Sequence, residues 1–192
     1  MRYVGIDPST KTGLVAIDEN ENVLKQKELK GLGKEDPKRI VTLTDEVMDY
    51  VHRGDAVVIE SPGLSTQRAV QSGWIHGSMR NALYRRGLNY HDVAPNAVKK
   101  YVNVTGWTGE KGKKVRLKDK EKKAAVAQAV LDHFGFSHPS DNVVDAYIMA
   151  QIARAIWFTQ HDIPITLTDY QLEVVDTILN PKPKKKRKKV KK

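Results

Sequence analysis

Residues 1–18 read MRYVGIDPSTKTGLVAID and predict a β-hairpin with which the fold begins. Two β-rich runs flank a short polar turn, and Gly13 suits the left-handed or bulged position that such a turn often needs. The first run ends in an acid, Asp7. A carboxylate at the end of a core strand costs free energy unless it is paired or binds a cation. Asp7 could therefore hold a metal, or it could cap the turn by accepting bonds from nearby backbone N–H groups.

The rest of the chain predicts one more antiparallel strand and then alternating helices and strands. The expected strands are 22–30, 55–60 and 88–94, and the expected helices are 36–54, 65–86, 96–102, 119–134, 142–159 and 168–179. Strands joined by short turns pair antiparallel, whereas strands joined through helices pair parallel. We therefore expect an α/β fold with a mixed five-stranded sheet, antiparallel over its first three strands, then parallel, and flanked by helices.

Local signals define several helix ends. Asp36-Pro37 predicts a helix with Asp36 as N-cap and Pro37 as its first residue, ended by Gly54. Ser65 or Thr66 is expected to cap the next helix, and Asp119 a later one. Residues 106–117 are rich in Gly and Lys and predict a mobile loop.

Two glycines lie four residues apart inside the predicted helix 65–86. Each of Gly73 and Gly77 costs roughly 1 kcal/mol relative to Ala in a helix interior. Such a cost is normally offset when another backbone approaches closely. We expect that backbone to belong to another helix or to a partner subunit.

The composition excludes several classes of protein. There is no cysteine, so disulfide frameworks and thiolate metal sites are impossible. No run of membrane-spanning length and no apolar leader is present, and we expect a soluble intracellular protein without a membrane partner.

The net charge of +10 is concentrated at the end of the chain. Residues 181–192 contain nine Lys or Arg and no acid, and without them 24 basic residues face 23 acids. We expect this tail to be disordered and to bind a polyanion such as nucleic acid. A nuclear import signal, an appended tag and a solubilising tail are the alternatives.

Further acids are predicted to join Asp7. Glu60 ends the strand 55–60, and if that strand is a parallel neighbour of the first, both acids lie at the sheet edge where α/β folds bind ligands. Asp141 and Asp145 are four residues apart and share one helix face. Asp141 could instead be an ordinary N-cap.

Asp145 could also be a solvent-exposed residue in an apolar run. Ile148 and Met149 fall on the same helix side, however, so Asp145 is expected to face inward. Four carboxylates without a matching set of Cys or His favour Mg²⁺ or Mn²⁺ over zinc.

These motifs resemble the RuvC family of Holliday-junction resolvases over about residues 2–158. The matching segments are VGIDPSTKTG (4–13), VVIE (57–60), APNAVK (94–99) and the Asp-x-x-x-Asp-Ala beginning of the helix near 142–159. The resemblance implies a ribonuclease H-like fold, a homodimer and two-metal hydrolysis of DNA at branched junctions, leaving 5′-phosphate and 3′-hydroxyl ends. It also implies two Mg²⁺ ions, replaceable by Mn²⁺, no small-molecule substrate, and the cytoplasm of a bacterium or a phage-infected host.

The resemblance also implies roles for single residues. Asp7, Glu60 and Asp145 match metal ligands of the family. Lys99 matches a lysine near the scissile phosphate, and Lys123 matches a second lysine.

The chain departs from the family pattern at two places. The family usually spaces its last two ligands three residues apart, but Asn142 stands there, and we expect Asp141 to reach the metal instead. Gly63 replaces an aromatic residue linked to junction opening, for which Trp74 or Trp107 could compensate.

A basic segment between residues 99 and 123 is expected to contact DNA. It contains ten Lys or Arg against three acids, which suits backbone contacts without base reading. The expected nucleic-acid-binding residues are Lys99, Lys100, Lys111, Lys113, Lys114, Arg116 and Lys123. Arg80, Arg85 and Arg86 could extend the surface, and a plain solvated loop is the alternative.

The sequence therefore predicts three regions: a RuvC-like nuclease domain (1–160), a helical extension (161–180) and a basic tail (181–192). A non-catalytic junction binder and a nuclease of the same fold acting on flaps or RNA–DNA hybrids stay open. Actin-like and sugar-kinase-like ATPases begin with a similar hairpin, but they need a second phosphate loop and a larger chain.

Overall fold

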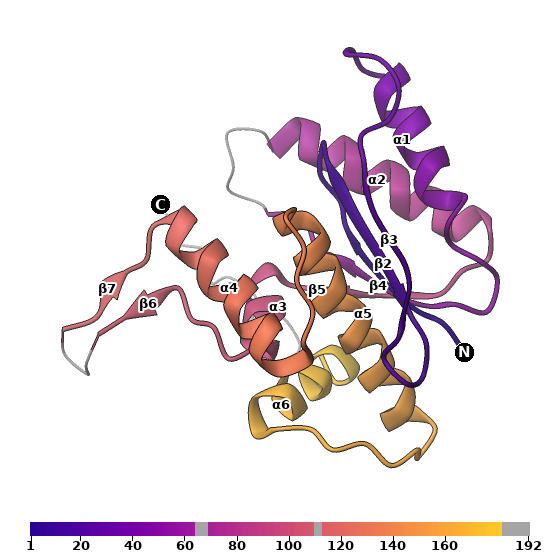
Figure 1. Cartoon of the computed structure of the whole chain (residues 1–192). Helices are drawn as coiled ribbons and strands as arrows, with labels where there is room; N and C mark the ends of the chain where they lie inside the picture. Colours follow the sequence, from indigo (N-terminus) through magenta and orange to yellow (C-terminus); the bar gives the residue numbers. More distant parts are fainter. Residues whose placement is uncertain (64–68, 110–112, 182–192) are drawn as a thin grey trace, which may run out of the picture.

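The computed structural model describes residues 1–63, 69–109 and 113–181, and it contains a five-stranded mixed sheet (Figure 1). The strand order is β3-β2-β1-β4-β5. The strands are β1 (Tyr3–Asp7), β2 (Thr12–Ile17), β3 (Val23–Leu29), β4 (Ala56–Glu60) and β5 (Tyr90–Val93). The first three pair antiparallel, whereas β1–β4 and β4–β5 pair parallel. The predicted fold class is confirmed.

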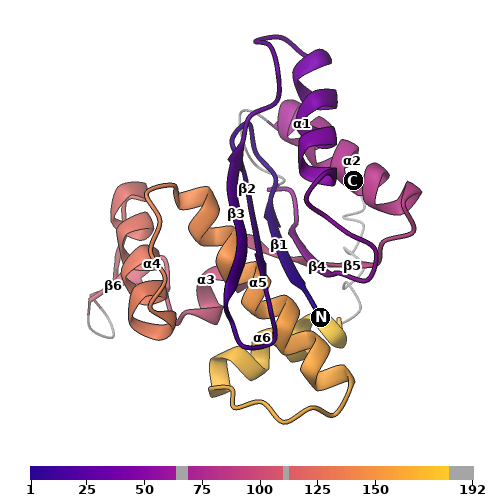
Figure 2. The same ribbon diagram turned by 45° about the vertical axis from the view of Figure 1, so that its right-hand side comes forward.

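Helices cover both faces of this sheet (Figures 1 and 2). On one side are α1 (Lys38–Met48) and α2 (Ala69–Arg85); on the other are α3 (Pro95–Tyr101), α4 (Asp119–Phe134), α5 (Asp141–Gln160) and α6 (Asp169–Leu179). Side chains alternate between the two faces of a strand. Val4 and Ile6 of β1 accordingly pack in the α1–α2 core, and Tyr3 packs in the α5 core. The same alternation directs Asp7 towards α5.

Two glycines bring α5 directly against the sheet. A Cβ atom added to Gly5 of β1 would lie 1.9 Å from the carbonyl oxygen of Ala146. A Cβ added to Gly13 of β2 would lie 1.9 Å from the carbonyl oxygen of Asn142. The bare backbone at these positions therefore permits a contact that any side chain would block, and it places the beginning of α5 beside the end of β1.

The ends of α1 differ from the prediction. The helix begins one residue after Pro37, which is its N-cap and makes no side-chain cap bond. Asp36 does not cap because its carboxylate binds Arg39, at 2.9 Å. The helix ends at Met48, well before Gly54, which adopts a positive φ of 88° in the turn that leads to β4.

Two other predicted caps are also shifted by one residue. Asp119 is the first residue of α4; Lys118 is the N-cap, and its N–H donates to the Glu121 carboxylate at 2.7 Å. Ser140 is the N-cap of α5, so the interpretation of Asp141 as an ordinary N-cap is wrong.

Residues 106–117 are not a plain loop as predicted. They contain β6 (Trp107–Thr108) and β7 (Val115–Arg116), which pair antiparallel. Lys111 lies outside the described residues, as do the predicted cap at Ser65 or Thr66 and the tail beyond Pro181.

The glycines of α2 face open space. Among the described residues, nothing lies within 4 Å of a Cβ added to Gly73 or Gly77. The expected contact with another helix of the described chain is therefore wrong, and the partner-subunit alternative stays a prediction. No described helix is both long and apolar enough to cross a membrane.

Candidate active site

The parallel pairing of β1 with β4 places two acids side by side. Ile6 is in register with Ile59, so the next residues, Asp7 and Glu60, end adjacent strands at the same sheet edge. They are near neighbours, since the charge of Glu60 raises the pKa of Asp7. Asp141 and Asp145 of α5 lie near enough to raise the pKa of Asp7 through charge repulsion. The structure therefore brings together all four acids that the sequence singled out.

Asp7 lies at the centre of this cluster. Only 7% of it is exposed, and burial is the main cause of a pKa well above its ordinary value. Repulsion by Glu60, then Asp145, then Asp141 adds to the shift. Burial and the neighbouring acids therefore favour the protonated form of Asp7 in the metal-free protein.

Two neighbouring acids have raised pKa values for the same reasons. Burial, followed by repulsion from Asp145, raises the pKa of Glu60 to about 7, and Lys99 opposes the shift. Burial raises the pKa of Asp145 to about 6, against the opposing charges of Lys99 and Lys123.

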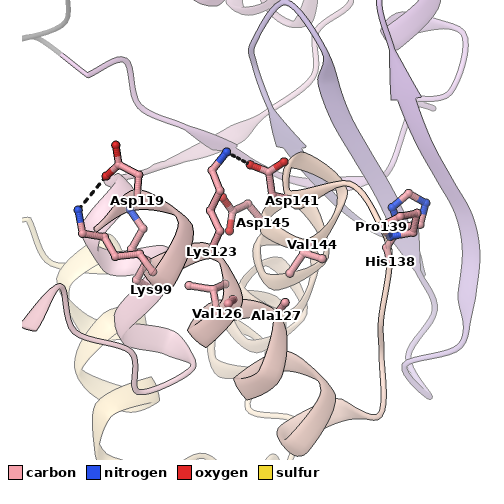
Figure 3. Close-up of a pocket in the computed structure, with 12 residues that line it drawn as sticks. Lys99, Asp119, Lys123, Val126, Ala127, His138, Pro139, Asp141, Val144 and Asp145 are labelled. Atoms are coloured by element: carbon pink, nitrogen blue, oxygen red, sulfur yellow. Dashed lines mark hydrogen bonds and ion pairs between the residues drawn. The ribbon is translucent and has the colours of Figure 1, made fainter. Parts of the chain in front are cut away.

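A cavity of about 540 Å³ opens between α4 and α5 beside these acids (Figure 3). Lys99, Lys123, Asp141 and Asp145 line it. In Figure 3, Lys123 extends from α4 to form an ion pair with Asp141, with Asp145 beside them. This hydrogen-bonded pair raises the pKa of Lys123. The cavity therefore presents both carboxylates and ammonium groups to a ligand.

The donor chemistry of the cluster suits a hard divalent cation, because every candidate ligand atom is a carboxylate oxygen. Within residues 1–63, 69–109 and 113–181, no three Asp, Glu or His side chains form a group that could hold a metal ion as they stand. Asp141 is paired with the Lys123 ammonium group, which balances its negative charge in this structure.

Asn142 makes a different contact from the acid beside it. Its Nδ2–H donates to the carbonyl oxygen of Lys11 at 2.7 Å, which links α5 to the β1–β2 turn. Asp141, by contrast, lines the cavity.

A network around Arg80 was missed by sequence reasoning. The Arg80 guanidinium on α2 donates to the backbone carbonyl of Glu60 at 2.8 Å and also binds the Asp92 carboxylate. It further donates to the carbonyl of His76, a buried residue whose pKa falls to about 4 through burial and the Arg80 charge. Arg80 therefore links α2 to the ends of β4 and β5, and its contribution to a DNA surface stays a prediction.

The predicted basic residues lie both at the acid cluster and on the elements next to it. Lys99 and Lys123 lie at the acid cluster. Lys100 pairs with Glu173 of α6, and Lys113, Lys114 and Arg116 are exposed beside or within β7. Arg86 donates to the carbonyl of Met48 at 2.5 Å.

The raised pKa values predict that the metal-free protein loses stability as the pH rises from about 4 to about 7. In this range the folded acids keep protons that the unfolded chain, with ordinary carboxyl pKa values near 4, has released. The folded state thus binds more protons, and its stability falls with pH by on the order of 3 kcal/mol for each of Glu60 and Asp145.

Urea unfolding in EDTA at pH 5, 6 and 7.5 measures this loss. Glu60→Gln is the matched variant, since it removes the acid with a pKa of about 7; its stability should depend less on pH. Equal pH profiles for the two proteins would contradict the prediction.

Comparison with known proteins identifies the fold of this chain. No family model and no curated protein sequence matches the chain. Among solved structures, RuvC of Thermus thermophilus in complex with a Holliday junction substrate is similar, with a TM-score of 0.61 and 18% identity over 85% of this chain and 97% of that one. A second Thermus thermophilus RuvC structure gives a TM-score of 0.60 and 20% identity, with 85% and 98% coverage. The chain has a RuvC-like fold, and the predicted resemblance is confirmed at that level.

Proposed function

We propose that the protein is an endonuclease that resolves Holliday junctions or related branched DNA by metal-dependent hydrolysis. The observation that carries this proposal is the convergence of Asp7, Glu60, Asp141 and Asp145 at the carboxyl end of parallel strands. The RuvC-like fold supports it, and one of the similar proteins is complexed with a Holliday junction substrate. The proposed products carry 5′-phosphate and 3′-hydroxyl ends.

The four acids are proposed to hold two Mg²⁺ ions, which Mn²⁺ could replace. Such ions, when bound, activate a water and stabilise the leaving oxygen of a displacement at phosphorus. Asp7 would be the central ligand because it is buried and the charges of Glu60, Asp145 and Asp141 all raise its pKa. Lys99, at the cavity beside Glu60 and Asp145, would neutralise charge on the reacting phosphate. Lys123 would move from Asp141 to the DNA as a cation replaces it.

Asp141, rather than Asn142, is proposed as the fourth ligand. Asp141 lines the acid cavity, whereas the side-chain amide of Asn142 donates a hydrogen bond to the backbone carbonyl of Lys11. We expect Asp141→Asn to reduce cleavage by roughly ten- to a hundredfold, because removing one carboxylate weakens metal binding and charge stabilisation. Asn142→Ala should retain cleavage within about threefold in a Mg²⁺ titration, and full activity of Asp141→Asn would contradict the assignment.

A homodimer is proposed through the exposed face of α2. Val70, Trp74 and Tyr84 are 69%, 59% and 82% exposed, and Gly73 and Gly77 lie on the same face with open space beside them. An apolar stripe next to two glycines would allow a partner backbone to approach. Trp74→Glu should shift sedimentation from dimer to monomer, whereas Leu131→Glu, on exposed α4, should not. A monomeric parent protein would contradict this proposal.

The remaining features are assigned as follows. Residues 1–160 form the proposed nuclease domain and 161–180 a helical extension, in which Val174 and Val175 of α6 join the α5 core. Lys100, Lys113, Lys114 and Arg116 are proposed to contact the DNA backbone together with Lys99 and Lys123. The proposed location is the cytoplasm of a bacterium or a phage-infected host.

A panel of DNA substrates tests the function. Four-way junction, flap, duplex and RNA–DNA hybrid substrates are incubated with the full chain, with and without Mg²⁺. We expect symmetric cleavage of the four-way junction that requires Mg²⁺ and leaves ligatable ends. Faster cleavage of flaps or hybrids would mean that these, rather than four-way junctions, are the preferred substrate, and binding without any product would favour a non-catalytic junction binder.

A further inference from the structure

A second cavity lies next to the acid cluster. It has a volume of about 600 Å³ and is formed by α3, the β6–β7 hairpin and α6. The residues that line it include Lys99, Lys100, Trp107, Arg116, Lys122 and Tyr170. Lys99 and Lys122 also line the acid cavity. We call this second cavity the α3–α6 groove, and the two shared lysines make it continuous with the proposed active site.

The groove combines positive charge with aromatic side chains. Four of its lining residues are Lys or Arg, and none is an acid. Lys100 is paired with Glu173 and Lys122 with Asp119, so part of this charge is balanced from outside the groove. Trp107 is 54% exposed in the groove wall. This combination is typical of surfaces that bind unpaired nucleic acid, because cations follow the phosphates and aromatic rings stack on bases.

Hydrogen bonds, an ion pair and ring stacking hold the residues of the groove wall in place. Tyr170 on α6 bonds to His133 through its hydroxyl at 3.0 Å, and the two rings stack at a centroid distance of 6.2 Å. The Lys100–Glu173 pair fastens α6 to α3. In the β6–β7 hairpin, Trp107 pairs with Arg116, and the Thr105 hydroxyl donates to the Trp107 carbonyl at 2.8 Å.

We propose that the α3–α6 groove binds an unpaired stretch of DNA beside the phosphate held at the acids, with one base stacked on Trp107. The groove volume of about 600 Å³ lies in the range of sites that enclose small ligands, which suits one or two nucleotides better than a duplex. Unpaired nucleotides arise where strands exchange in branched DNA. This inference rests on the proposed function in one respect, which is that the ligand is DNA.

The test compares single-stranded with duplex DNA. Binding of a fluorescent oligo-dT of about twelve nucleotides and of a duplex of equal length is measured by anisotropy with the full chain in EDTA, which separates binding from cleavage. Trp107→Leu should weaken oligo-dT binding about 5- to 100-fold, because stacking is lost, and duplex binding less than about twofold. Trp107→Phe should restore most of the affinity. Lys114→Ala, in the same hairpin but outside the groove, should weaken both ligands alike and lower the salt dependence.

The outcomes separate this inference from the proposed function. Unchanged oligo-dT binding by Trp107→Leu, or an equal loss on both ligands, overturns the groove proposal whether or not the parent protein cleaves junctions. If Trp107→Leu selectively loses oligo-dT binding while the parent protein cleaves no DNA substrate, the groove proposal is supported and the nuclease proposal is overturned. Thermal unfolding of each variant checks that it is folded. Because Trp107 is exposed, its substitution should leave the unfolding temperature nearly unchanged.

Discussion

Asp7→Asn should abolish Mg²⁺-dependent cleavage, with a loss of at least about a thousandfold. Asp7 is the buried acid on which Glu60, Asp141 and Asp145 act together. The amide has nearly the same shape but lacks the negative charge that a cation needs. The expected loss corresponds to about 4 kcal/mol of transition-state stabilisation, within the range for metal-assisted hydrolysis.

Two further measurements make the Asp7 result specific. Junction binding in EDTA should be unchanged or tighter, because a negative charge near the phosphates has been removed. Unfolding in EDTA at pH 7.5 should show a more stable protein, since repulsion among buried carboxylates is relieved. The matched control is Asp132→Asn on α4, where the exposed carboxylate accepts a bond from Gln128; it should change neither property. Retained cleavage by Asp7→Asn would remove the basis of the proposed mechanism.

The position of Asp7 beside Glu60 could be predicted because it depends on patterns with a regular period. Each acid directly follows an apolar β run, and the crossover between the two strands imposes parallel pairing. The four-residue spacing from Asp141 to Asp145 likewise predicted one shared helix face. The sheet and the acid cluster therefore follow from local sequence and chain connectivity.

The contacts around those acids could not be predicted, because they join side chains to partners that no period relates. Arg80 binds the backbone carbonyl of Glu60, which carries no sequence signal. Lys123 reaches Asp141 only because α4 packs beside α5. The α3–α6 groove depends on α6, which lies more than fifty residues after Trp107 and whose sequence shows only an amphipathic helix.

Helix ends were displaced for a related reason. Asp36 has the sequence signature of an N-cap, but in the folded chain its carboxylate binds Arg39 and also accepts a bond from Gln71 of α2, at 3.2 Å. The strands β6 and β7 have two residues each, too few for an alternating pattern to appear. Tertiary contacts thus determined the helix ends and the two short strands, which local sequence propensity does not specify.

Gly5→Ala should destabilise the protein by more than about 3 kcal/mol, at the upper end of the effects of overpacking. The added Cβ would lie 1.9 Å from the Ala146 oxygen, 2.5 Å from the Ala150 nitrogen and 2.8 Å from the Met149 Cβ. Two of these atoms are backbone, so rotating a side chain cannot relieve the contact. The helix α5 must move away from β1, and Asp145 must move with it.

Urea unfolding measures the expected loss, and Gly106→Ala is the matched control. Among the described residues, a Cβ added to Gly106 would have only the Cε atom of Lys122 within 4 Å, at 3.9 Å, so alanine there should change the stability by less than about 1 kcal/mol. At a temperature where Gly5→Ala is still folded, cleavage should also fall, because the distance between Asp7 and Asp145 has changed. A Gly5→Ala protein as stable as the parent would mean that α5 does not rest on β1 as described. The close contact at Gly5 is therefore both the feature that packs the sheet and the one that sets the spacing of the acids.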